Sequence, residues 1–154
     1  MNIFTATHDY ESWLASQSNI VQADLDYKHK VMCSSPFIML RGTDYRWIQL
    51  LLEHLSELSE APKILSINDL HIENFGTWRD AEGRLAWGVN DTDEAYEAPC
   101  THDPVRLCTS AGFAIDEGKL SISLDEACAI ILESYTKTIA EGGQPFVLAE
   151  NHRK

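Results

Sequence analysis

Ser66–Gly76 reads SINDLHIENFG and Val89–Ala95 reads VNDTDEA, and these two polar segments decide how the rest of the chain is organised. Each segment follows an apolar run that is typical of a strand, so acid and amide side chains gather at strand ends. A scaffold can hold side chains rigidly at such positions and still leave them open to a ligand. The sequence therefore predicts a functional site built from these two segments.

A β-hairpin is predicted between the two segments. Its strands are Phe75–Arg79 and Arg84–Asn90, joined by the turn Asp80–Gly83, and a further strand, Lys63–Ile67, precedes the first segment. Apolar side chains alternate along the second hairpin strand, which predicts that one of its faces is buried. These side chains are Leu85, Trp87 and Val89. Glu97–His102 is predicted to be a loop.

The clearest predicted helix is Asp44–Ser59. It carries an apolar stripe at helical spacing, and Thr43 or Asp44 can cap its start. The stripe consists of Trp47, Leu50, Leu51, His54, Leu55 and Leu58. Because His54 lies on this stripe, it is predicted to be a hydrogen-bonded core histidine. Phe37–Leu40 fits either a buried strand or the lead into this helix, because periodicity does not separate the two for so short a run.

Other segments also have helical or short-element patterns. They are Asp9–Ser16, Ile20–Val31, Asp103–Ile115, Ser123–Ile139 and Pro145–Glu150. Asp103 followed by Pro104 is typical of a capped helix start, and Ser123 with Glu126 forms a capping box. The predicted fold class is α+β, mostly helical, with a small hairpin sheet that carries the loop. One domain is expected over 1–154, with a helical N-terminal segment, 1–35, and a site region, 36–150.

The composition limits the partners of the chain. Its 154 residues include 24 acidic and 12 basic side chains, which give a formal net charge of -12. Such a surface repels nucleic acid and anionic membranes, and no basic cluster offsets it, so neither is an expected partner. No segment has the pattern of a secretion signal or of a membrane span, so a cytoplasmic location is expected.

The cysteines show no paired spacing and are expected to be reduced, with several of them in the core. They are Cys33, Cys100, Cys108 and Cys128. Cys100, His102 and Cys108 are a weak candidate set of zinc ligands, because no C-x-x-C pair supports them.

Asp69 and Asn74 stand in the order Asp-Leu-x-x-x-Asn, which is the spacing of the catalytic loop of protein kinases. In that loop the Asp accepts the proton of the attacking hydroxyl, the Asn binds magnesium, and a second Asp beyond a hairpin binds the metal that bridges the phosphates. Asp91 occupies the position of that second Asp. Magnesium prefers a few hard oxygen ligands, which one carboxylate, one amide and the phosphate oxygens provide.

Two other interpretations of the same residues stay open. Asp, Asn and Gly at strand ends are ordinary turn formers, and the acids after the hairpin fit a solvated loop. Alternatively, several carboxylates serve a metal-assisted or two-carboxylate hydrolase, which does not need the kinase-type spacing. Those carboxylates are Asp69, Glu73, Asp91 and Asp93.

Several segments, in this order, resemble one large bacterial family, the domain of unknown function 2252. They are Ser35-Pro36-Phe37, Leu40-Arg41-Gly42, Asn68-Asp69-Leu70-His71, Glu73-Asn74-Phe75-Gly76, Asn90-Asp91-Thr92-Asp93-Glu94-Ala95, and Asp103-Pro104-Val105-Arg106-Leu107 with Ser110. The family is similar to the protein-kinase and aminoglycoside-phosphotransferase superfamily. The resemblance extends over about His29–Glu150 and covers the catalytic-loop and metal-binding part.

The resemblance implies a role for each matching residue. Asp69 would be the catalytic base, with His71 beside it in the catalytic loop, and Mg2+ and ATP would be the cofactors. The implied metal ligands are Asn74 and Asp91, assisted by Asp93. The remaining implied roles are cofactor binding for Arg41 and bracing of the loop for Asp103 and Arg106.

The chain departs from the family at Asn68, where glycine is usual, and at Thr92, where an aromatic residue is usual. It contains no Gly-x-Gly-x-x-Gly pattern and no lysine with a convincing strand context. Two functions are therefore expected. One is a kinase-like phosphotransferase that acts on an acceptor substrate and is incomplete without a nucleotide-binding lobe. The other is a non-catalytic relative that self-associates or binds a partner chain supplying that lobe.

Overall fold

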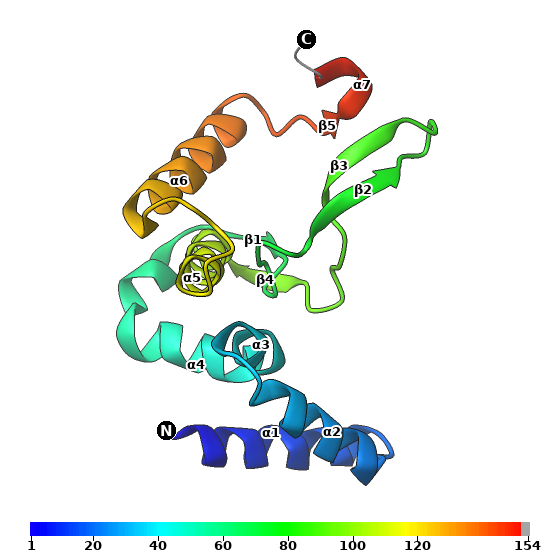
Figure 1. Ribbon diagram of the computed structural model, residues 1–154, viewed down its shortest axis with the longest axis vertical. Helices are drawn as coiled ribbons and strands as arrows, with labels where there is room; N and C mark the ends of the chain where they lie inside the picture. Colours follow the sequence, from blue (N-terminus) through cyan, green and yellow to red (C-terminus); the bar gives the residue numbers. More distant parts are fainter. Residues whose placement is uncertain (152–154) are drawn as a thin grey trace. The chain divides into compact units, whose positions relative to one another are not determined.

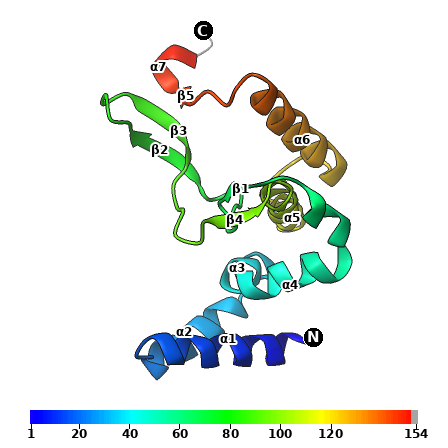
Figure 2. The ribbon, with the colours of Figure 1, turned by 180° about the vertical axis from the view of Figure 1, so that it is seen from behind.

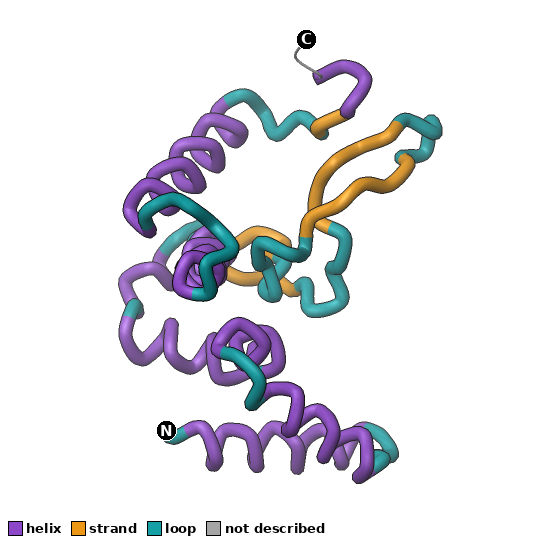
Figure 3. The backbone as a smooth tube through the Cα atoms, in the orientation of Figure 1, coloured by secondary structure: helices purple, strands orange, loops and turns teal. Residues whose placement is uncertain are grey.

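The computed structural model describes residues 1–151 of the chain. The chain folds as two compact units, Met1–Ala61 and Pro62–Lys154, where the sequence predicted one domain. Helices and two small antiparallel sheets make up the two units, so the predicted α+β class is confirmed (Figures 1 and 3). Within residues 1–151, no helix is long and apolar enough to cross a membrane.

The N-terminal unit consists of helices joined by short turns. They are α1 (Ile3–Gln17), α2 (Gln22–Met32), α3 (Pro36–Gly42), α4 (Asp44–His54) and the 3-10 helix η1 (Ser56–Glu60). The run Phe37–Leu40 is thus helical. Ser35 explains this, because its side chain accepts the N–H of Ile38 and so caps α3, and Pro36 occupies the first turn.

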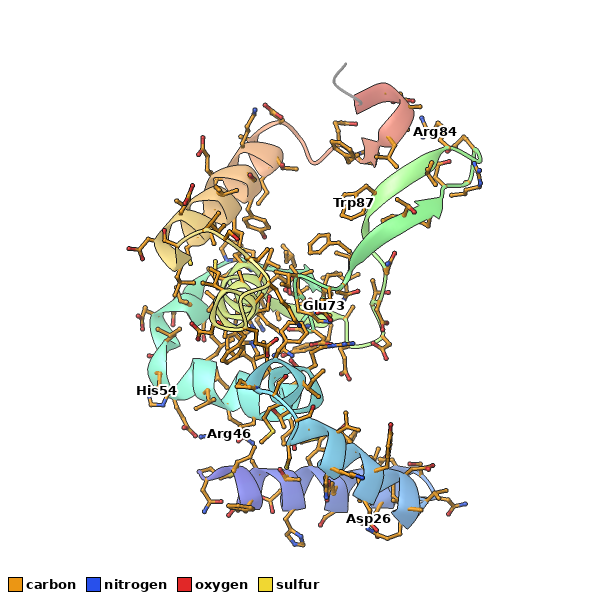
Figure 4. The ribbon with its side chains drawn as sticks, in the orientation of Figure 1. Asp26, Arg46, His54, Glu73, Arg84 and Trp87 are labelled. Carbon is orange, nitrogen blue, oxygen red and sulfur yellow. The ribbon has the colours of Figure 1, made fainter. Side chains whose placement is uncertain are left out.

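The predicted start of this helix at Asp44 is confirmed, but its predicted end at Ser59 is wrong. Thr43 does not cap α4, because its hydroxyl donates to the carbonyl of Met39 instead, at 2.7 Å. The helix stops at His54, since Leu55 leaves the helical region with φ -133° and ψ 44°. His54 is consequently exposed rather than a core histidine (Figure 4). Of the predicted stripe, Leu51 is buried at 3% exposure.

The C-terminal unit contains two antiparallel sheets. The first pairs β1 (Lys63–Ser66) with β4 (Tyr96–Pro99), and the second has the order β2 (Phe75–Arg79), β3 (Leu85–Val89), β5 (Phe146–Val147). The predicted strand and hairpin are confirmed, but the loop predicted for Glu97–His102 is wrong because its first half belongs to β4. Local patterning missed β4 because its partner strand precedes the whole hairpin in the sequence, with Lys63 opposite Pro99.

The hairpin buries the opposite face to the predicted one. Leu85 and Trp87 are 39% and 46% exposed, whereas Ala86 between them is 4% exposed. Ala86 is opposite Val147 of β5, which is 2% exposed, so this small pair forms the buried contact. Figure 2 shows β5 beside β3 at this position. The tight turn contains Gly83 at φ 81°, a conformation that favours glycine.

Three helices complete the C-terminal unit. They are α5 (His102–Asp116), α6 (Leu124–Ala140) and the short α7 (Leu148–Asn151). Ser123 caps α6 by accepting the N–H of Glu126, as the capping box predicted. Several small apolar side chains of α5 and α6 are buried. These side chains are Ala111, Ala114 and Ala127.

Candidate functional site

Asp103 of α5 holds the start of the loop that follows β1. Its two carboxylate oxygens accept the backbone N–H groups of Ile67 and Asn68, each at 2.9 Å. The sequence predicted that Asp103 caps its own helix, and this prediction is wrong. The helix α5 begins one residue before Asp103, whose side chain bonds the loop instead. Because the carboxylate is 7% exposed, these charge-assisted bonds are shielded from water.

Asn68 adopts a left-handed backbone with φ 65°, the only such non-glycine residue in the described part of the chain. Asparagine tolerates this conformation better than most residues because its side chain can bond locally. Its amide group donates to the carbonyl of Ser66 at 3.2 Å and to that of Glu94 at 3.4 Å. The bonds of Asn68 thus tie the loop to the segment that follows the hairpin.

The Asp69 side chain is oriented from two sides. Arg106 of α5, which is 1% exposed, donates to one carboxylate oxygen of Asp69 at 2.5 Å. His71 places its Nε2 at 3.7 Å from the other oxygen. Asp69 itself is 20% exposed, so its carboxylate sits at the boundary between the buried guanidinium and solvent. Such an arrangement fixes a carboxylate in position while leaving part of it reachable by a ligand.

Asn74 bridges the two polar segments. Its amide nitrogen donates to the carbonyls of Asp69, at 3.2 Å, and of Asp91, at 3.0 Å, while its amide oxygen accepts the N–H of Asp91 at 2.9 Å. Asn74 is 4% exposed, and its own carbonyl accepts the N–H of Asn90 at 3.0 Å. The loop and the end of β3 are therefore held together at the backbone level. The amide oxygen of Asn74 keeps one lone pair that can face a cation.

The acids beyond the hairpin remain open. The side chains of Asp91 and Asp93 are exposed, on the stretch that leaves β3. Glu73, on the loop and labelled in Figure 4, is also exposed. Its carboxylate pairs with Lys119 at 3.3 Å. Arg41 lies on α3 of the N-terminal unit with an exposed side chain. The C-terminal unit thus contains one carboxylate that neighbouring side chains hold in place, that of Asp69, and several carboxylates that are exposed to solvent.

The loop and the residues that follow β3 carry oxygen donors, the kind of ligand that Mg2+ prefers in proteins. Within residues 1–151, no three His, Cys, Asp or Glu side chains gather as a metal centre would need, so the candidate zinc set of Cys100, His102 and Cys108 is not assembled. A site composed of two carboxylates and the amide of Asn74 is of a different kind, and Mg2+ takes few protein ligands and fills the remaining positions with water and phosphate oxygens.

Ser110 is a residue of the site to which sequence reasoning assigned no role. It is fully buried, accepts the N–H of Ile72 at 3.2 Å, and donates to the carbonyl of Leu107 at 2.8 Å. Asp103, Arg106 and Ser110 recur at helical spacing, so they form one polar stripe on the inner face of α5. A polar stripe where a buried helix should be apolar is the signal that would have identified all three as supports of the loop.

Residues 20–151 match one protein family, described as "Uncharacterized protein conserved in bacteria (DUF2252)". The match covers most of the chain, including the loop, the hairpin and the polar stripe of α5. No curated protein and no solved structure matches the chain.

Proposed function

This chain belongs to the family described as uncharacterized proteins conserved in bacteria (DUF2252), and we propose that it is a kinase-like phosphotransferase domain. In this proposal a magnesium nucleotide binds through Asp69, Asn74 and Asp91. The observation that supports it best is the bridge made by Asn74, whose side chain bonds the backbone of Asp69 and of Asp91. The order of these three residues along the chain is the order that phosphoryl transfer uses in protein kinases.

Asp69 is the proposed base. Arg106 occupies one of its oxygens, so the other is the one that accepts the proton of an acceptor hydroxyl. His71 lies beside that second oxygen, so a polar side chain borders the proposed base. The buried guanidinium of Arg106 keeps the carboxylate of Asp69 pointed outward. This matters because phosphoryl transfer depends more on the positioning of such groups than on covalent chemistry by the protein.

Asn74 and Asp91 are the proposed ligands of Mg2+, with Asp93 as an assisting acid. When bound, the cation neutralises charge on the phosphate oxygens. A cation is needed here because the chain carries a net charge of -12, which otherwise repels a nucleotide polyphosphate. The exposed carboxylates of Asp91 and Asp93 are accessible to such a complex.

Thermal unfolding with and without Mg-ATP tests nucleotide binding. A ligand at a hundred times its dissociation constant stabilises the folded chain by about 2.7 kcal/mol, which raises the melting temperature by several degrees. Asp91→Asn should abolish this rise. Glu133→Gln, which removes one exposed acid from α6, is the matched control and should keep it. An equal rise in both variants, or none in the wild type, would count against the magnesium site.

A second function, assembly with a partner chain without catalysis, is favoured by one observation. The C-terminal unit exposes several large apolar side chains, each by 42% or more of its surface. They are Leu65, Trp78, Trp87, Leu124, Ile130, Leu132, Ile139 and Phe146. Exposed apolar area of this kind is typical of an interface. Light scattering distinguishes the functions: a monomer that binds Mg-ATP supports the first, and an oligomer that ignores Mg-ATP supports the second.

A further inference from the structure

Cys108 of α5 and Cys128 of α6 face each other where the two helices pack. The Cys128 thiol is near enough to Cys108 to contribute to the raised pKa of the Cys108 thiol, and both residues are half-buried and reduced. The neighbouring thiols come from different helices, so a bond between them would be a long-range crosslink rather than a local one. The two cysteines come together because α5 packs against α6, not because they are close in the sequence.

Both cysteines line one cavity of about 470 Å³ between α5 and α6. Its other walls include Val105, Phe113 and Leu132, and apolar surface dominates it. A cavity of this size is within the range of small-molecule sites. A small reagent can therefore approach the pair of thiols without unfolding the helices.

We propose that Cys108 and Cys128 are a site of reversible oxidation, at which a small-molecule disulfide of the glutathione class forms a crosslink between α5 and α6. The proposal stands apart from the phosphotransferase function, because neither thiol belongs to the loop or to the residues that follow β3. Two adjacent thiols lining an accessible cavity are the arrangement that thiol–disulfide exchange requires.

The reaction divides into two exchanges. The Cys128 thiolate attacks one sulfur of the reagent, whose S–S bond breaks and releases one thiolate. Cys108 then gives its proton to solvent and attacks the Cys128 sulfur, releasing the second thiolate. Two protein thiols and one external disulfide thereby become one protein disulfide and two external thiols, which take up the two protons.

The environment of Cys108 sets the order of these exchanges. Burial, together with the neighbouring Cys128 thiol, raises the pKa of Cys108 to about 12. A thiol with such a pKa is a poor first nucleophile at neutral pH. Cys108 suits the second exchange, because the mixed disulfide on Cys128 is already held beside it and the attack is intramolecular.

Oxidised glutathione added to the reduced full-length chain tests the proposal. The chain has four cysteines, and we expect two of the four thiols to disappear, with peptide mapping that links Cys108 to Cys128 and full recovery after dithiothreitol. The crosslink should also raise the melting temperature by several degrees, because it restricts the unfolded chain. Persistence of both thiols, or a crosslink between other cysteines, would overturn the proposal.

Single substitutions separate the roles of the two thiols. Cys108→Ser should stop the reaction at a glutathione adduct on Cys128, and Cys128→Ser should leave Cys108 as a free thiol. Cys33→Ser, which removes an exposed cysteine of the N-terminal unit, is the matched control and should form the crosslink at the wild-type rate. A crosslinking rate in Cys33→Ser reduced tenfold would refute the assignment, as would an adduct that persists on Cys128 in the wild type.

Discussion

The Asp69 loop, residues 66–74, and the β2–β3 hairpin, residues 75–89, are neighbours in the sequence but are stabilised in opposite ways. Side chains from α5 hold the loop, and those of Asp103, Arg106 and Ser110 are all buried. The hairpin tip, where Figure 4 labels Arg84, is held chiefly by the pair of the exposed Arg84 and the half-buried Asp80, at 2.8 Å.

The two regions differ in whether the polar side chains that hold them are buried or lie at the surface. A buried polar network is costly when it loses a member, because the remaining groups cannot return to water. A surface ion pair loses little, because water and salt replace the missing partner. The loop should therefore respond strongly to single substitutions, and the hairpin tip should respond weakly. The following predictions test this contrast in order of decreasing effect.

Asp69→Ala should have the largest effect on stability. It removes the carboxylate from beside the guanidinium of Arg106, which is 1% exposed, so a buried charge loses one of its partners. We expect the free energy of unfolding to fall by about 3 kcal/mol, measured by urea denaturation. Asp93→Ala removes an exposed acid and serves as the control, with no measurable loss. A loss for Asp69→Ala as small as that of the control would contradict the buried pair.

Asp103→Ala should be the next largest. It leaves the N–H groups of Ile67 and Asn68 without their acceptors, and we expect a loss of about 2 kcal/mol in the same urea experiment. Asp103→Asn keeps one acceptor oxygen and should lose roughly half as much. Equal losses in the two variants would mean that the carboxylate does not hold the loop in the way described.

A smaller effect is expected from pH, through His102 at the start of α5. Burial lowers the pKa of His102 below its ordinary value of 6.5, with nearby Asp103 opposing the shift. The unfolded chain therefore takes up the proton first, so this stability is fully present above pH 6.5 and is lost as the pH falls from there toward the folded pKa. Urea midpoints between pH 7.5 and 5 should fall less for His102→Gln than for the wild type.

His8→Gln, which alters an exposed histidine of α1, is the control for the pH series. It should follow the wild-type curve throughout. If His102→Gln and His8→Gln both follow the wild type, burial of His102 does not contribute to the acid sensitivity.

Arg84→Ala should have the smallest effect. Arg84 contacts Asp80, Glu82 and Glu150 at the hairpin tip, and these acids raise the pKa of its guanidinium, but the whole cluster is solvated. The urea midpoint of the variant should lie close to that of the wild type, and the small difference should vanish in high salt. A shift as large as that of Asp103→Ala would remove the contrast between the loop and the hairpin.

Local patterns predicted what depends on neighbours in the sequence. The hairpin, the cap at Ser123 and the residue types of the loop are all set within a few positions, and the sequence placed the first two correctly. Local patterning identified Asp103 only as a helix-start residue, and its role in bracing the loop was implied by the family resemblance, because its bonds to Ile67 and Asn68 are long-range. The strand β4 was missed for a related reason, since its pairing with β1 spans the whole hairpin.

Burial was the property that patterning predicted least well. His54 lies at the end of α4 because the backbone turns at Leu55, and a periodic stripe gives no sign of that turn. In the hairpin, the short strand β5 covers the face that carries Ala86, and the pairing of Ala86 with Val147 is again long-range. The site residues were found by chemistry and order, whereas the contacts that position them come from tertiary structure.

The most direct test of the proposed magnesium site is the amide NMR spectrum of the chain during titration with Mn2+ and ATP, in which the paramagnetic ion replaces Mg2+. We expect the signals of Asp69, Asn74 and Asp91 to broaden first. Asp91→Asn should remove this preference for the three signals, and Glu133→Gln should preserve it. Broadening that is spread evenly over the acidic surface, or centred away from these three residues, would contradict the proposed site.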